Sequence, residues 1–71
     1  MVVQSVIVSK DLTLEVAKGL VRELGYMVYK IDNTRNYYRF RQVDPDELRN
    51  KGMKKFRTET LNKYIKIIHQ Y

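Results

Sequence analysis

The chain of 71 residues contains no cysteine, no tryptophan, one proline, one histidine and three glycines. Without cysteine, neither a disulfide framework nor a thiolate metal site can form, which fits a reducing compartment better than secretion. No apolar run approaches the length of a membrane span, and residues 1–9 lack the basic and long apolar regions of a signal peptide. We therefore expect one small basic domain, residues 1–71, located inside the cell and not in a membrane.

Groups that could carry catalysis are also scarce. His69 is the only histidine, and a single histidine is more often a surface or packing residue than a general base. The one acidic cluster, Asp44, Asp46 and Glu47, flanks Pro45 and is most simply the start of a helix. The three glycines are scattered, so no phosphate-binding loop is present. We predict no enzymatic activity, no catalytic or metal-binding residues and no cofactor.

What the chain has in excess is positive charge, with 14 Lys and Arg against 8 Asp and Glu, a formal net charge of +6. Residues 1–33 hold four basic and four acidic side chains, whereas residues 34–71 hold ten basic and four acidic ones. The whole excess therefore lies in the second half. This asymmetry favours an anionic partner, although charge that serves only solubility would have the same pattern.

The first two thirds of the chain have clear secondary-structure signals. Residues 2–9 are rich in β-branched side chains and predict a strand. Residues 13–24 predict one long helix, capped by Thr13 and followed by Gly25. Residues 26–32 and 36–43 predict a hairpin of two strands, and residues 44–51 a short second helix. Asp44 is the expected cap of that helix, with Glu47 as the partner in a capping box and Gly52 as its end.

The last third is ambiguous. Residues 55–60 alternate and predict a strand. Residues 64–71 also alternate, with Ile65 and Ile67 on one face, yet Leu61, Ile65 and Ile68 have helical spacing. Periodicity alone does not decide between strand and helix for residues 61–71.

Several short segments along nearly the whole chain resemble one group of proteins. They include residues 3–8 (VQSVIV), Gly25-Tyr26, residues 30–34 (KIDNT), residues 36–42 (NYYRFRQ), Pro45 and residues 56–58 (FRT). Together they resemble the uncharacterised small "YRFRQ" domain proteins of tailed phages and large DNA viruses. The resemblance implies a viral origin, with a location in the host cytoplasm or in the virion, and a strand at the C-terminus. It implies no particular activity.

The run of residues 36–42 is the most distinctive part of the chain. On a strand, side chains alternate between faces, so Tyr38 and Phe40 point one way while Tyr37, Arg39 and Arg41 point the other. We expect the apolar strand positions to face the helix, namely Ile7, Met27, Ile31, Tyr38, Phe40, Phe56, Ile65 and Ile67. The opposite face of the sheet then collects Lys30, Tyr37, Arg39, Arg41, Lys55, Arg57, Tyr64 and Lys66. A basic sheet face with exposed rings can bind single strands, because phosphates pair with Arg and Lys while bases stack on aromatics. The expected nucleic-acid-binding residues are Tyr37, Arg39, Arg41, Lys55, Arg57 and Lys66.

We therefore expect an α+β domain in the order β-α-β-β-α-β(-β), with a mainly antiparallel sheet of four to five strands. One long helix would cover one face, and a short second helix would follow the third strand. The expected function is a non-enzymatic binding module for nucleic acid, with single strands favoured. The alternative is a structural or protein-interaction module, such as a minor virion component or a homodimer, whose basic face contacts an acidic partner. The two hypotheses differ in whether oligonucleotides bind.

Overall fold

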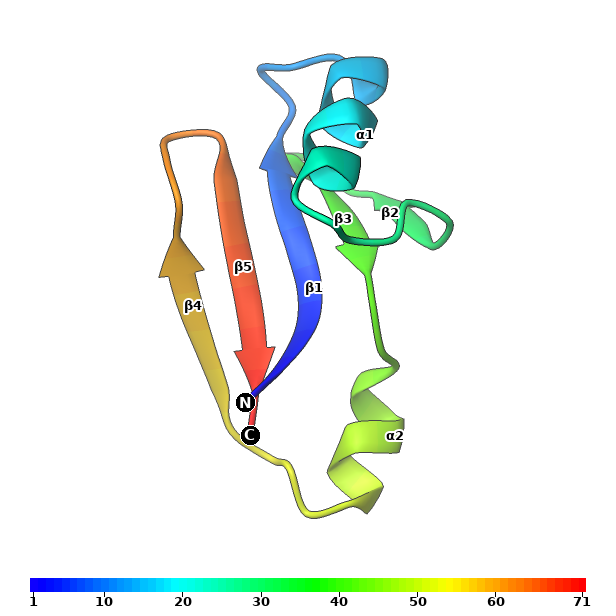
Figure 1. The fold of residues 1–71 in the computed structure, drawn as a ribbon, viewed down its shortest axis with the longest axis vertical. Helices are drawn as coiled ribbons and strands as arrows, with labels where there is room; N and C mark the ends of the chain where they lie inside the picture. The colour runs from blue at the N-terminus through cyan, green and yellow to red at the C-terminus, as the bar shows by residue number, and fades with distance from the viewer.

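The computed structural model describes all 71 residues and is an α+β fold of five strands and two helices (Figure 1). In chain order the elements are β1 (Val2–Ser9), α1 (Leu14–Glu23), β2 (Ile31–Asn33), β3 (Tyr37–Arg41), α2 (Pro45–Asn50), β4 (Phe56–Thr60) and β5 (Ile65–Gln70). The expected order of elements is confirmed. Neither helix is long and apolar enough to cross a membrane.

The five strands form a single antiparallel sheet in the order β2-β3-β1-β5-β4. The first strand of the chain is thus the central strand, between β3 and the last strand, β5 (Figure 1). The pairing of β1 with β5 contains one irregularity: Val3 pairs with His69 and Ser5 with Ile68, so Gln4 is an extra residue in β1. Such a bulge bends the strand and increases its twist.

The core lies between the sheet and α1. The Thr13 hydroxyl caps the helix by accepting a hydrogen bond from the Val16 N–H (3.3 Å), as expected. Ala17 and Val21 are fully buried against Val6, Val8 and Phe40. The helix is shorter than predicted, with ten residues and a length of about 15 Å. It packs against β1 and β3, so the expectation of one long helix across the sheet is wrong.

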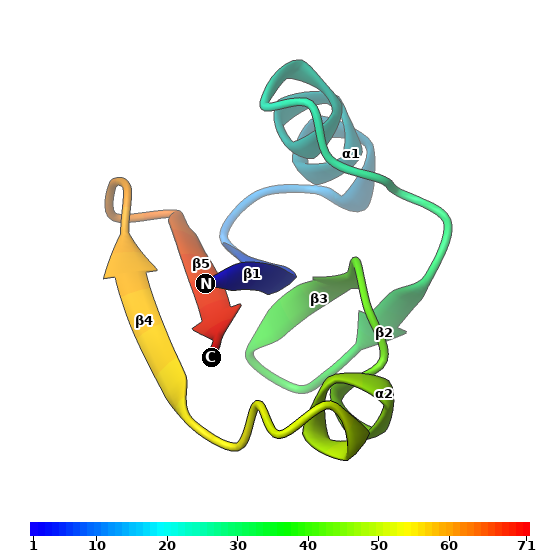
Figure 2. The same ribbon diagram turned by 60° about the horizontal axis from the view of Figure 1, so that its bottom comes forward.

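The second helix lies at the other end of the sheet from α1 (Figure 1 and Figure 2). Asp44 caps it by accepting from the Asp46 N–H (2.9 Å), and Pro45 is its first residue. The chain turns away at Gly52, whose φ of 88° is in the left-handed region that favours glycine. The buried amide of Gln70 in β5 donates to the carbonyls of Pro45 and Met53, at 3.2 and 2.8 Å. These bonds fix α2 and the segment after it to the end of the sheet.

Two expected strands differ in length from the observed ones. Residues 26–30 are not a strand, because the side chain of Gln42 bonds both backbone groups of Met27, at 2.8 and 2.9 Å. The strand expected over residues 36–43 ends at Arg41, and the N–H groups of Gln42 and Val43 both bond the Gln4 carbonyl. At the C-terminus the ambiguity is resolved in favour of a strand, in which Ile65 and Ile67 are buried.

Candidate nucleic-acid interface

A groove of 440 Å³ crosses the sheet on the face away from α1. The side chains that line it come from β1, β3, β4 and β5. They are Gln4, Ser5, Ile7, Tyr37, Arg39, Phe56, Thr58, Lys66 and Ile68. We refer to these nine residues as the groove.

Two basic side chains lie on either side of the groove's centre. Ile7 of β1 pairs with Arg39 on one neighbouring strand and with Lys66 on the other. Paired residues of adjacent strands share a face, so both cations project into the groove, on strands about 10 Å apart. Neither Arg39 nor Lys66 forms an ion pair, because the ion pairs of the molecule join Arg41, Arg49 and His69 to carboxylates. Asp32 of β2 is the cross-strand partner of Arg39, but its carboxylate pairs with Arg41, so no direct ion pair compensates either groove cation.

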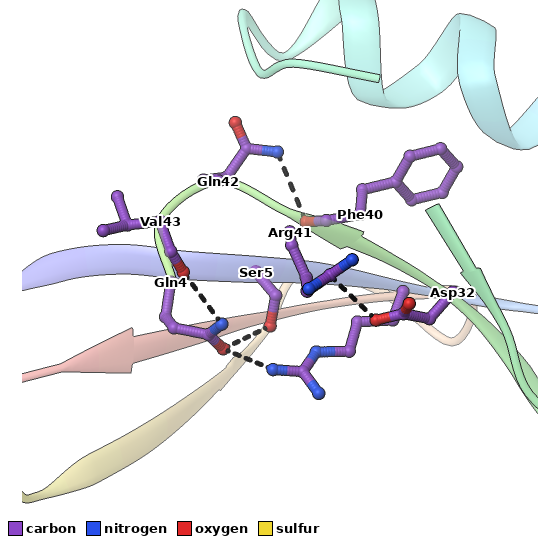
Figure 3. A network of polar contacts seen from close by, with 8 residues as sticks. Gln4, Ser5, Asp32, Phe40, Arg41, Gln42 and Val43 are labelled. Atoms are coloured by element: carbon purple, nitrogen blue, oxygen red, sulfur yellow. Dashed lines mark hydrogen bonds and ion pairs between the residues drawn. The ribbon is translucent and has the colours of Figure 1, made fainter. Parts of the chain in front are cut away.

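Arg39 is held in place by the bulge residue Gln4. Its Nη2 donates a hydrogen bond to the Gln4 Oε1 (3.2 Å), which also accepts from the Ser5 hydroxyl (2.8 Å) (Figure 3). The Gln4 amide nitrogen donates to the Val43 carbonyl (3.1 Å). Gln4 and Ser5 are almost completely buried, whereas Arg39 is partly exposed. The guanidinium thus has a fixed neutral neighbour and free donors for an anionic ligand.

Arg41 lies on the same face but is already engaged. Its Nε is 3.0 Å from the Asp32 Oδ2 (Figure 3). The buried Nε–H is not aimed at this oxygen well enough for a hydrogen bond, so the contact is an ion pair only. Arg41 is not among the residues that line the groove, and its charge is balanced locally.

Lys55 and Arg57 lie on the opposite face from the groove. In β4 it is Phe56 and Thr58 that line the groove, and side chains alternate along a strand. The expectation placed Phe56 and Ile7 toward the helix because they are apolar. The helix does not extend over β4, however, and β1 carries three consecutive apolar residues, Val6 to Val8, of which Val6 and Val8 fill the core. The structure therefore groups Tyr37, Arg39, Arg41 and Lys66, and separates Lys55 and Arg57 from them.

Two aromatic rings occupy opposite corners of the groove. Tyr37 pairs with Ser9 near one end of the sheet, and Phe56 pairs with Gln70 near the other. Tyr37 is 36% exposed and Phe56 is 49% exposed. Large apolar rings left this accessible beside uncompensated cations can stack on flat ligand groups.

The groove continues into a second hollow of 200 Å³ toward the turn between β4 and β5. The two hollows share Ile7, Tyr37 and Lys66. The second adds Lys63, whose Nζ is 4.9 Å from the centre of the Tyr64 ring. Tyr64 was expected on the basic face, although not as a contact residue. Lys63 was not expected there, because its position depends on a turn that the sequence pattern does not specify. The combined path presents three cations and three aromatic rings.

No metal-binding cluster accompanies this surface: three or more His, Asp or Glu side chains do not come together anywhere in the chain. No family model matches the chain, and neither a curated protein nor a solved structure is significantly similar to it.

Proposed function

We propose that the protein is a non-enzymatic module that binds single-stranded nucleic acid in the groove. The observation that carries the proposal is the pair of uncompensated cations, Arg39 and Lys66, in one groove with the exposed rings of Tyr37 and Phe56. Phosphates would pair with the cations, and bases would stack on the rings.

Single strands are favoured over duplexes by the chemistry of the rings. A base can stack on Tyr37 or Phe56 only when it is not already stacked within a double helix, and stacking on aromatics is a common way to hold unpaired bases. The Thr58 hydroxyl, exposed on the same surface, can hydrogen-bond a base edge or a sugar. The resemblance of residues 36–42 to small phage and viral proteins is consistent with a role in handling a viral genome, which we include in the proposal.

The test is a titration of labelled single-stranded and duplex oligonucleotides at several salt concentrations. The variant Arg39→Gln/Lys66→Gln removes both groove cations. The matched control, Arg22→Gln/Lys55→Gln, removes two exposed charges away from the groove and leaves the same net charge. We expect the groove variant to bind weakly and its logarithmic salt slope to fall by about 1.4, whereas the control retains most of the affinity.

The contribution of stacking is tested separately with Tyr37→Leu and Tyr37→Phe. Loss of one stacked base costs about 1–3 kcal/mol, which corresponds to roughly a 5- to 150-fold weaker affinity, and the phenylalanine variant should bind almost normally. The turn before β3 is unaffected by either change, because Thr34 bonds only the backbone of Tyr37.

Equal losses in the groove variant and the charge-matched control would mean that binding is diffuse and the groove is not the site. Absence of oligonucleotide binding at low salt would refute the proposal. In that case the same cations would be tested against acidic peptides, as the alternative of a protein-interaction module requires.

A further inference from the structure

Strand β4 is an open edge of the sheet. All five of its side chains are exposed, and β5 is its only neighbour. Lys55 and Tyr71 exchange both backbone hydrogen bonds, and the Leu61 N–H bonds the Ile65 carbonyl. Backbone groups alternate in direction along a strand, so Arg57 and Glu59 also face β5, and Phe56, Thr58 and Thr60 direct their N–H and C=O groups outward. Three donors and three acceptors are thus available at this edge.

We propose that a second copy of this chain pairs with β4 in antiparallel orientation, with Thr58 on the two-fold axis. Thr58 would then exchange two hydrogen bonds with Thr58 of the partner subunit, and Phe56 would pair with Thr60 of the partner subunit on each side. All outward backbone groups of β4 are used in this register. The result is a continuous sheet across both subunits.

The charges of β4 favour this register over the others, and they favour a second copy of the chain as the partner. In this register Arg57 lies opposite Glu59 of the partner subunit, and the two-fold axis repeats the pair. These pairs exchange no backbone hydrogen bonds, so their side chains approach most closely. Within its own subunit Glu59 contacts His69 through Oε1 at 2.8 Å, which leaves Oε2 for Arg57 of the partner subunit. A register centred on Arg57 would oppose two arginines, and one centred on Glu59 would oppose two glutamates. A register shifted by one residue would place the outward N–H and C=O groups of one subunit opposite residues of the other whose N–H and C=O groups already bond β5. The sequence Phe-Arg-Thr-Glu-Thr is therefore electrostatically complementary to itself in one register only.

The edge lacks two of the features that usually prevent such pairing, and its charged residues, Arg57 and Glu59, are complementary in the proposed register. β4 contains no proline, and its register with β5 is regular. The other edge of the sheet, β2, has only three residues, and its central Asp32 is paired with Arg41. Pairing through β4 is therefore the more favourable of the two.

The symmetry places the two grooves on the same side of the shared sheet. Phe56 and Thr58 line the groove on one side of the interface and have counterparts on the other. The dimer does not depend on the proposed nucleic-acid binding, because its interface consists of backbone hydrogen bonds and charge pairs of β4 and needs no ligand. Failure of either proposal would leave the other intact.

A single cysteine at the axis tests the register directly, since the chain has no cysteine of its own. In Thr58→Cys the two Cα atoms would be about 5.5 Å apart, which suits a disulfide. In the control Thr60→Cys the two Cα atoms would be about 14 Å apart, beyond disulfide reach. We expect mild oxidation to give a covalent dimer of the first variant and little of the second. Equal cross-linking of both, or of neither, would overturn the register.

Sedimentation equilibrium tests the interface in solution. We expect the unmodified chain to approach twice its mass of 8.6 kDa with rising concentration. Thr58→Pro should remain monomeric, because it removes an outward donor that makes no bond within the monomer. Arg57→Glu and Glu59→Arg should each fail to self-associate, yet their equimolar mixture should dimerise because every opposed pair is then complementary.

A monomeric unmodified chain at all concentrations would refute the dimer. A dimer that survives in Thr58→Pro, or a mixture that fails to associate, would refute this interface. If the proline variant does not fold, the two cysteine variants decide the question.

Discussion

Gln4 connects three parts of the molecule through one buried amide. Its Oε1 accepts hydrogen bonds from Ser5 and Arg39, and its Nε2 donates to the Val43 carbonyl after β3. The same residue is the bulge in β1. A side chain that is 99% buried therefore sets both the bend of the central strand and the position of a groove cation.

We predict that Gln4→Leu destabilises the protein by about 1–3 kcal/mol, because the buried Ser5 hydroxyl loses its acceptor and the Val43 carbonyl its donor. Urea unfolding followed by circular dichroism measures the change. In Gln4→Leu/Ser5→Ala the unmatched hydroxyl is gone, so the double variant should lose less than the sum of the two single ones. Strict additivity would show that the two side chains are not coupled.

The individual site residues were predictable only where alternation along one strand decides them. In β3, Phe40 is fully buried and Tyr37 and Arg39 line the groove, as the pattern predicted. The ion pair of Arg41 with Asp32 could not be read from the sequence, because it depends on the register of β2 against β3. Phe56 was assigned to the wrong face because hydrophobicity indicates burial only where a second layer covers the strand.

Helix α1 owes its start to a single hydroxyl. Thr13 has an extended backbone (φ −73°, ψ 160°) and accepts from Val16, while Glu15 in the first turn complements the positive end of the helix dipole. The helix is only ten residues long, so its own propensity contributes little without this cap and the packing of Ala17 and Val21.

We expect Thr13→Ala to lower the free energy of unfolding by about 1 kcal/mol, since one N–H at the helix start loses its acceptor. Thr13→Ser keeps the oxygen and should be close to the unmodified chain. The midpoints of urea unfolding for the three proteins give the comparison. A serine variant as unstable as the alanine variant would contradict a capping role and indicate that the threonine methyl group matters instead.

The order of the elements was predictable because each has a local signal, such as a cap, a glycine or an alternating run. The length of β2 was not predictable. Gln42, 15 residues away in sequence, hydrogen-bonds both the N–H and the carbonyl of Met27, so these groups cannot pair with a neighbouring strand. The C-terminal segment had two compatible periodicities. The strand forms there because Asn62 bonds the N–H groups of Tyr64 and Ile65 in the preceding turn and because β1 supplies a partner.

The molecule as a whole has a small core. Eleven of its 71 residues are buried, and six of the apolar ones form a single cluster. A chain of this length has a total stability of roughly 4–11 kcal/mol. One large core side chain therefore accounts for a considerable part of it.

Removal of the Phe40 ring tests this dependence. Phe40→Ala should cost about 3–5 kcal/mol and leave the protein partly or largely unfolded at room temperature. The dispersion of amide signals in an NMR spectrum measures the folded fraction. Tyr29, which is 85% exposed, supplies the control: Tyr29→Ala should change the stability by no more than about 0.5 kcal/mol. A stably folded Phe40→Ala protein would mean that the core is held mainly by other contacts.

The central position of β1 has a consequence for the way the chain folds. Its two neighbours, β3 and β5, come later in the sequence, and β5 is the last element of the chain. During synthesis from the N-terminus, β1 is made before both of its neighbours, and the middle of the sheet cannot close until residues 65–70 have left the ribosome. Contacts between such distant parts of a chain slow folding, and we expect milliseconds to seconds rather than the microseconds of a helical bundle. Closure of the sheet should therefore begin only after the residues of β5 have been synthesised.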